Sequence, residues 1–386
     1  MRALLAFDKF KDALTARQAC AAAAAGLASR HADWTVDLCP LADGGEGFAE
    51  ILTAAAGGTL ASLTVTGPRG QPINASFGLV PWANIPPAAR ARLALPTAPR
   101  EEAEVAVIEM ASASGLALLP PDLRDPWHTT TLGTGQLLLA AAQAEVAAIV
   151  LGVGGSATSD LGLGALAALG LEFRSPTDDT VRPPYPTWWD WIDRITGSIP
   201  VELPPIRIAC DVSNPLLGPR GAAAIYGPQK GLKPDDVARL DHASARIALM
   251  LCQHCAQPDS LMDQPGAGAA GGIAFGLVAA AGAQLLPGFD LVAAWLDLEA
   301  KLAAADVVIT GEGRFDDSSL SGKGPGAVAA RALALGKPVQ VFAGQVTATR
   351  APAGLTLHAI TPEGQPLDEA LRQAGGNLTA AVARAL

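Results

Sequence analysis

Residues 146–164, VAAIVLGVGGSATSDLGLG, indicate the fold class of this chain. Its opening residues are mostly Val, Ile, Leu and Ala, which predicts a strand buried on both faces. Gly152, Gly154 and Gly155 predict a turn, and the apolar run 161–169 predicts a helix. A strand, a glycine turn and a helix N-terminus can form a bed of backbone N–H groups for a phosphate, although the same turn also occurs with nothing bound. The stretch therefore predicts an α/β protein with a candidate anion site.

Short apolar strands that lead into charged loops recur near both ends of the chain. Residues 3–7 precede Asp8, and residues 35–38 precede the loop 43–47. Residues 307–310 precede a long polar loop. In an open α/β sheet, ligands bind at the carboxyl ends of the strands. The pattern therefore places the candidate chemistry in these loops.

The middle of the chain has a different pattern. Residues 60–66 and 73–80 alternate apolar and polar side chains, which predicts an antiparallel hairpin. We therefore predict two α/β domains. The first is discontinuous and consists of residues 1–58 and 286–386, and the second is an inserted domain with a mixed sheet, residues 59–285.

Composition restricts the class of protein. Of 386 residues, 50% are hydrophobic and 17% are charged, which argues against disorder. The net charge is -10 and no basic patch is present, so nucleic acid is not an expected partner. No apolar run reaches membrane length, and five cysteines, an odd number, favour a reducing compartment. We expect a cytoplasmic protein, either a monomer or a homodimer, with a small-molecule substrate.

Several loops combine carboxylates with cations or glycines. Phosphoryl transfer to a hydroxyl needs such a set, because carboxylates hold Mg2+, cations neutralise phosphoryl charge, and one carboxylate can accept the hydroxyl proton. Any single loop could equally be a solvated turn with a helix cap. The side chains in question are Asp8, Lys11, Asp43, Glu46, Asp211, Glu312, Arg314, Asp316 and Lys323.

Two other functions fit parts of the sequence. Gly152, Gly154 and Ala157 satisfy the G-x-G-x-x-G/A dinucleotide fingerprint, and Glu172 follows at the spacing of a ribose-binding acid. These residues would suit a nicotinamide-dependent oxidoreductase that acts on a small hydroxy acid. A non-catalytic protein that binds a small acid is the second alternative.

Six blocks of sequence resemble the bacterial type 1 glycerate kinase family, in the right order over nearly the whole chain. They are DGGEG at 43–47, GGSAT at 154–158, ACDV at 209–212, GPQKG at 227–231, PGAGAAGG at 265–272 and GEGR at 311–314. The resemblance implies ATP-dependent phosphorylation of D-glycerate, with 2-phosphoglycerate as the favoured product. It also implies a flavodoxin-like domain built from both chain ends, and an active site in the cleft between the domains.

The resemblance and the acid–cation loops together suggest roles for individual residues. Asp211 or Asp316 would assist the attacking hydroxyl or hold Mg2+, and Lys11, Arg314 and Lys323 would bind phosphates or the substrate carboxylate. Lys9 and Ser159 depart from the family pattern, which usually has serine and asparagine there. The predicted catalytic residues are Asp8, Lys11, Asp211 and Asp316; those for ATP are Gly154, Gly155, Ser156, Thr158, Asp160 and Lys323; those for the substrate are Asp43, Gly44, Gly45, Glu46 and Arg314; and those for the metal are Asp211, Glu312 and Asp316.

Overall fold

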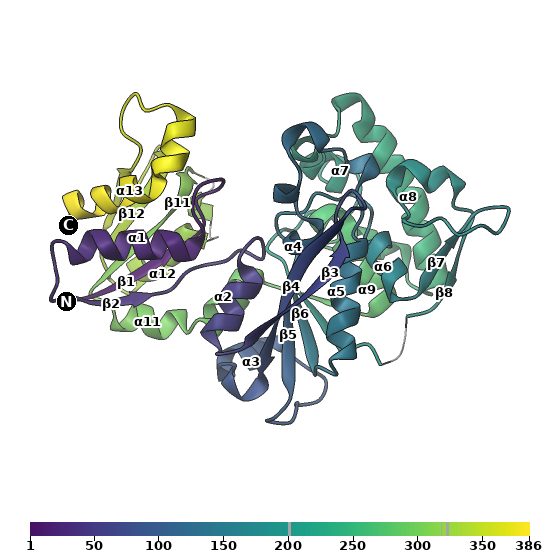
Figure 1. The fold of residues 1–386 in the computed structure, drawn as a ribbon, viewed down its shortest axis with the longest axis horizontal. Coiled ribbons are helices and arrows are strands. Elements are labelled where there is room, and N and C mark those ends of the chain that lie inside the picture. The colour runs from purple at the N-terminus through teal and green to yellow at the C-terminus, as the bar shows by residue number, and fades with distance from the viewer. Residues whose placement is uncertain (200–201, 318, 322–323) are drawn as a thin grey trace. The chain divides into compact units, whose positions relative to one another are not determined.

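The structure is a computed structural model that describes residues 1–199, 202–317, 319–321 and 324–386. The chain folds into two compact units. One unit contains residues 1–43 and 292–386, and the other contains residues 44–291. Figure 1 shows the N- and C-termini in the first unit, where the purple and yellow ends of the chain lie.

The first unit is built on a five-stranded parallel sheet with the order β13-β12-β11-β1-β2. Numbered within the unit, this is the flavodoxin-like order 2-1-3-4-5, whose switch point lies between β1 and β11. The strands are β1 (Arg2–Phe7), β2 (Thr35–Leu38), β11 (Val307–Phe315), β12 (Val339–Val346) and β13 (Leu355–Ala359).

Helices cover both faces of this sheet, because its inner strands bury apolar residues on both sides. Alternate residues of β1, including Leu5 and Phe7, share one core cluster with residues of α1 and α13. Leu4 lies on the opposite face and is also fully buried, on the side where α11 and α12 contact β1. The helices are α1 (Ala16–Ala28), α11 (Leu298–Ala304), α12 (Gly324–Ala334) and α13 (Leu367–Ala385).

The second unit contains a six-stranded mixed sheet with the order β10-β9-β6-β5-β4-β3. Strands β5, β6, β9 and β10 are parallel, whereas β3 and β4 form the antiparallel hairpin that the alternating pattern predicted. The bounds are β3 (Thr59–Thr66), β4 (Pro72–Pro81), β5 (Glu104–Glu109), β6 (Ala148–Gly152), β9 (Ile206–Ala209) and β10 (Gln284–Leu286). A separate hairpin pairs β7 (Leu171–Arg174) with β8 (Arg194–Gly197).

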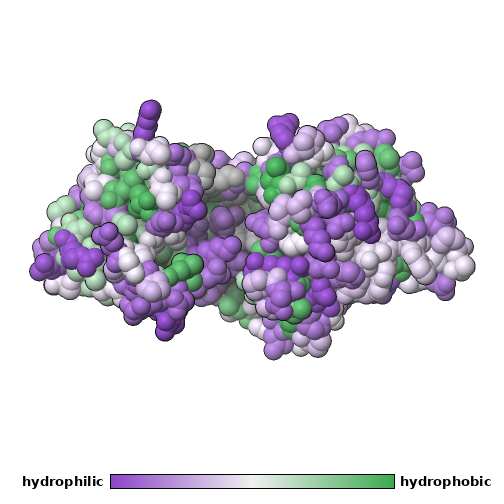
Figure 2. Space-filling view, turned by 90° about the horizontal axis from the view of Figure 1, so that it is seen from above, coloured by the Kyte–Doolittle hydropathy of each residue, from purple (hydrophilic) through white to green (hydrophobic). Residues whose placement is uncertain are grey.

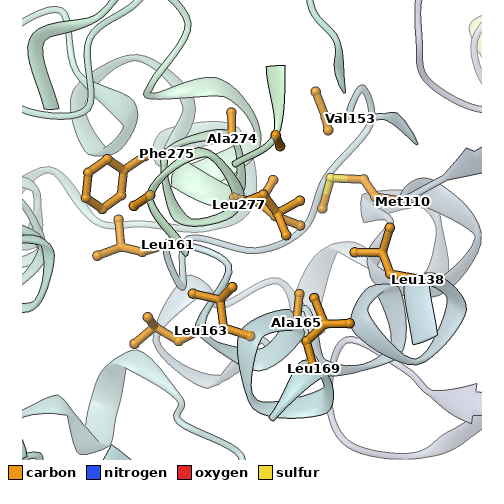
Figure 3. Close-up of a cluster of buried hydrophobic side chains, with 14 of the residues drawn as sticks. Met110, Leu138, Val153, Leu161, Leu163, Ala165, Leu169, Ala274, Phe275 and Leu277 are labelled. Carbon is orange, nitrogen blue, oxygen red and sulfur yellow. The ribbon is translucent and has the colours of Figure 1, made fainter. Parts of the chain in front are cut away.

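The core of the second unit lies where small-residue helices pack closely. Figure 3 shows Leu161, Leu163 and Leu277 among the buried side chains where α6 meets α9. Gly276 allows this approach, since an added Cβ would lie 2.1 Å from the carbonyl oxygen of Leu161. The helices of this unit are α2 (Phe48–Ala55), α3 (Pro87–Leu93), α4 (Ala111–Ser114), α5 (Leu132–Gln143), α6 (Leu163–Leu169), α7 (Ala222–Tyr226), α8 (Val237–His254) and α9 (Ile273–Ala281), and α10 (Gly288–Trp295) follows them.

The tryptophan-rich segment before β8 contributes one side chain to the core of this unit. Trp189 is fully buried and donates its indole N–H to the carbonyl oxygen of Pro184, whereas Trp191 is 70% exposed. Most of the surface shown in Figure 2 is hydrophilic, with hydrophobic residues in small separate groups. Within the described residues, no helix is both long and apolar enough to cross a membrane.

Candidate active site

In the first unit, the predicted acids gather at the switch point of the parallel sheet. Phe7 at the end of β1 pairs with Gly311 of β11, so Asp8 and Glu312 follow on neighbouring strands. The backbone N–H of Asp8 donates to the carbonyl oxygen of Gly311 over 3.0 Å. An added Cβ on Gly324, the first residue of α12, would lie 3.6 Å from Asp8 Oδ2. The Asp8 carboxylate therefore lies at the carboxyl edge of the sheet, close to a helix start.

Asp8 has an unusual electrostatic environment. Its pKa is raised to about 7, first by burial and then by the neighbouring charges of Asp43 and Glu312. Lys9 opposes this shift through its ammonium charge and through its backbone N–H, which donates to Asp8 Oδ1 over 2.7 Å. The Lys9 ammonium also lies 3.5 Å from Asp43 Oδ1. The raised pKa makes the Asp8 carboxylate a stronger base than an ordinary aspartate, which suits a group that takes up a proton.

The loop after β11 brings in the remaining charges of this unit. Burial, followed by the charges of Asp316 and Asp43, raises the pKa of Glu312, although a hydrogen bond with Ser319 opposes the shift. Arg314 is exposed and its Nε lies 3.6 Å from Asp316 Oδ2.

The backbone of Lys11 lies beside the loop after β11. An added Cβ on Gly313 would lie 3.2 Å from the backbone N of Lys11. The structure therefore brings together the side chains of Asp8, Asp43, Glu312, Arg314 and Asp316 and places the backbone of Lys11 beside them. Lys323 lies outside the described residues.

The carboxylates of this cluster have the chemistry of a partial magnesium site. Glu312 Oε1 is buried and accepts no hydrogen bond from the described residues. Among those residues, no group of three or more His, Cys, Asp or Glu side chains could hold a metal ion by itself. Mg2+ commonly takes only one or two protein carboxylates and completes its shell with phosphates and water. The donor set therefore fits a magnesium ion that arrives with a phosphate ligand.

In the second unit, two glycine loops lie backbone against backbone. The N–H of Gly154 donates to the carbonyl oxygen of Gly44 over 2.9 Å. An added Cβ on Gly154 would lie 2.7 Å from Gly45 N, and one on Gly155 would lie 2.7 Å from Glu46 Oε1. Gly155 has a φ of 71°, which favours glycine. The structure thus brings Gly44, Gly45 and Glu46 beside the turn at 154–155.

The helix N-terminus after this turn differs from the sequence-based expectation. Helix α6 begins at Leu163, and the N–H groups of Gly162 and Gly164 donate to the carboxylate of Asp160 over 3.1 and 3.2 Å. Thr131 donates its N–H and its hydroxyl to the same carboxylate over 2.7 and 2.9 Å. Asp160 is fully buried, so its carboxylate fixes the turn from inside and occupies the amides that were expected to hold a phosphate.

The other predicted residues of this unit differ in exposure. Ser156 and Thr158 are buried, and the hydroxyls of Thr158 and Ser159 have no hydrogen-bond partner among the described residues. Within the predicted ATP-binding turn, Gly154 and Gly155 are the residues that reach the surface. Asp211 follows β9, which pairs with β6, and its Oδ2 accepts the N–H of Phe289 over 2.9 Å.

Two polar residues near the turn were missed as candidate site residues. Lys230 is 1% exposed and donates from Nζ to Ser156 Oγ over 2.8 Å and to the carbonyl oxygen of Thr158 over 2.5 Å. Glu109 ends β5 and accepts the N–H of Ala49 over 3.0 Å. The position of Glu109 at the end of a predicted strand could have marked it as a candidate site residue. The sequence around Lys230, a Gly-Pro turn, does not indicate that this lysine is buried.

Known proteins identify the family. The model of the glycerate kinase family matches residues 3–386. The chain belongs to the glycerate kinase family. A glycerate kinase of Haemophilus influenzae is 39% identical over 350 residues, which cover 89% of this chain and 86% of the relative. A glycerate kinase of Bacillus subtilis is 36% identical over 380 residues, which cover 97% of this chain and 94% of the relative.

A solved structure agrees with this family membership. A crystal structure assigned to glycerate kinase 2 of Salmonella typhimurium LT2 superposes with a TM-score of 0.75 and 36% identity, covering 100% of this chain and 97% of that chain. The resemblance and the α/β fold class are confirmed, and the protein is an enzyme of the kinase class.

The dinucleotide fingerprint is accidental. Helix α6 starts well after Gly155, so the glycines do not open a helix as the fingerprint requires. Glu172 lies in β7 of the two-stranded hairpin, where Arg174 donates to its carboxylate. Neither the helix nor the acid stands where a nicotinamide nucleotide would need it, and family membership supports a kinase instead.

Proposed function

We propose that the protein transfers the γ-phosphoryl group of ATP to a hydroxyl of D-glycerate, with Mg2+, and that 2-phosphoglycerate is the product. The observation that carries this proposal is Asp8, a carboxylate with a pKa of about 7 at the switch point of a flavodoxin-like sheet. The names of the relatives supply the substrate, and one of them, from Escherichia coli, is named glycerate 2-kinase.

Asp8 is the proposed acceptor of the hydroxyl proton. A carboxylate whose pKa lies near the working pH can take a proton from the attacking hydroxyl and release it afterwards. Lys9 lies between Asp8 and Asp43 and limits the repulsion between them. Lys11 and Arg314 are the proposed cations for the phosphates or for the glycerate carboxylate, because a small hydroxy acid needs a fixed cation to orient it.

Glu312 and Asp316 are the proposed carboxylates for Mg2+. Two observations support this assignment: Glu312 Oε1 accepts no hydrogen bond from the residues that the structure describes, and the charge of Asp316 lies nearby. When bound, the ion would neutralise charge on the transferring phosphoryl group. Asp211 was predicted for the same role and remains a less direct candidate, since its Oδ2 accepts a hydrogen bond from the start of α10.

The turn at 154–155 is the proposed contact for the nucleotide phosphates, with Gly44, Gly45 and Glu46 on the adjacent loop as substrate contacts. Asp160 supports that turn from inside. A single active site in the cleft between two domains stays a prediction, as do the domain boundaries at 58/59 and 285/286. The five free cysteines support a reducing compartment, and we infer that the enzyme works in the cytoplasm.

Steady-state kinetics of the purified protein with ATP, Mg2+ and D-glycerate test the proposal, with Asp8→Asn as the variant and Asp12→Asn as its matched control. Asp12 is exposed and has a φ of 61°, which Asn tolerates. We expect Asp8→Asn to lower kcat by about 100-fold or more and Asp12→Asn to leave it unchanged. Full activity of a folded Asp8→Asn protein would remove Asp8 from the mechanism, and turnover of a different hydroxy acid alone would overturn the substrate.

A further inference from the structure

Lys230 is a buried cation for which the proposed chemistry gives no direct role. It ends the short helical turn Pro228–Lys230, and 1% of the residue is exposed. Within the described part of the chain, no carboxylate lies at ion-pair distance from its ammonium group. Asp160 is the charge that acts on it, and burial lowers the pKa of Lys230 to about 7 against the opposing effect of Asp160.

Burial of a lysine without a paired carboxylate costs free energy, and an apolar residue of the same length would pack there at a lower cost. The hydrogen bonds of Lys230 show what the position gains. Both join the lysine to the turn after β6, one at the hydroxyl of Ser156 and the other at the carbonyl oxygen of Thr158. Lys230 is too deeply buried to touch a ligand itself.

Two buried charges thus hold the turn from opposite ends. Asp160 ties its far end to Thr131 and to the start of α6. Lys230 ties its near end, directly after the two glycines that reach the surface. Those glycines lie against Gly45 and Glu46, so a shift of Ser156 would move them relative to the neighbouring loop.

The position in the sheet gives this support a functional consequence. Strand β6 lies between β5 and β9, all three parallel, and the turn stands at its carboxyl end. Ligands of open α/β sheets bind at that edge. We propose that Lys230 is a positioning residue of the phosphoryl-transfer reaction, which acts through Ser156 and Thr158 to hold Gly154 and Gly155 in their catalytic arrangement. The inference rests on the proposed function, because it assigns the turn to that reaction.

The test compares Lys230→Met with Lys233→Met in the complete protein. Lys233 is an exposed residue of the same segment and serves as the matched control. We expect Lys230→Met to fold, to lower kcat about 10- to 100-fold, and to change KM for D-glycerate less than threefold, because a misplaced turn affects the transition state more than substrate binding. Lys233→Met should keep wild-type kinetics.

Ser156→Ala gives a second, independent measurement. It removes the hydroxyl partner while Lys230 stays in place, and we expect kcat to fall about 3- to 10-fold. If Lys230 acts through Ser156, the double variant will be less impaired than the product of the two single losses. Should Lys230→Met fail to fold, the kcat of Ser156→Ala decides: a loss supports the proposal, and wild-type kcat overturns it.

Wild-type turnover of ATP with D-glycerate is measured first. If the wild-type protein shows no such turnover, the proposed function is contradicted before any substitution is made. The positioning role of Lys230 is contradicted only by the comparison of variants. Folded Lys230→Met protein with wild-type kcat overturns the inference. A loss of activity that only matches the fraction of unfolded protein also overturns it, because Lys230 would then serve stability alone.

Discussion

Replacement of Asp160 by Asn tests whether this carboxylate organises the turn after β6. Its Oδ2 accepts three hydrogen bonds, two from Thr131 and one from Gly164, and its Oδ1 accepts one from Gly162. Asn can keep its oxygen at the Oδ2 position only by placing its NH2 group against the N–H of Gly162. One buried donor then loses its partner and faces a second donor.

The structure allows the size of this effect to be estimated. A buried polar group left without a partner costs about 1–3 kcal/mol. For a domain of this size, 1 kcal/mol lowers Tm by about 2–4 °C, so we expect a decrease of about 2–12 °C in the transition of the second unit. The control is Asp190→Asn, whose side chain is 90% exposed and should change stability by less than about 0.5 kcal/mol.

Thermal unfolding followed by circular dichroism measures both variants, with urea unfolding as a second scale. Two transitions are expected if the two compact units unfold separately. Asp160→Asn should also lower kcat, because the same turn carries Gly154 and Gly155. An Asp160→Asn protein that melts within 1 °C of the control would refute the hydrogen-bond arrangement on which the account of this turn depends.

Three further outcomes follow from the described contacts. Gly154→Ala should lower the free energy of unfolding by about 1–3 kcal/mol and remove most of the activity, because the added Cβ meets the backbone of Gly45. Gly376→Ala, where the added Cβ meets open space on α13, should raise the free energy of unfolding by about 0.5–1 kcal/mol. Urea unfolding compares the two variants. The pKa of Lys230 is lowered to about 7 in the folded chain from near 10.5 when unfolded, so stability should rise with pH between these values, and Lys230→Met should remove that rise. The effect of Asp8 on the pH dependence of stability has the opposite sign to that of Lys230. Because the pKa of Asp8 is raised to about 7, stability should fall as pH rises from about 4 to about 7. Asp8→Asn should reduce that fall, which unfolding curves at several pH values measure.

The strands were largely predictable because their signal is local. The apolar runs before Asp8 and Cys210 are β1 and β9, and the alternating runs on either side of Gly70 are the hairpin β3–β4. The order of strands in the first unit is not local, since β1 pairs with β11 from the far end of the chain. Only the family resemblance supplied that part of the fold.

The acids of the candidate site could be predicted from the sequence, whereas the buried residues that hold its turn in place could not. Strand-end acids such as Asp8 and Glu312 follow from a general rule about α/β sheets. Asp160 was assigned to ATP because the sequence cannot show that Thr131 and the start of α6 surround its carboxylate. Lys230 was missed because its burial depends on Ser156, which is 74 residues away in sequence.

Phosphorus NMR of a reaction mixture that contains the purified protein, ATP, Mg2+ and D-glycerate shows whether the protein phosphorylates D-glycerate. We expect that ADP and a phosphomonoester form together, that the phosphomonoester is 2-phosphoglycerate, and that EDTA abolishes both signals. Formation of 3-phosphoglycerate would correct the position of transfer. Unchanged ATP beside unchanged D-glycerate, with protein that is folded, would contradict the proposed function.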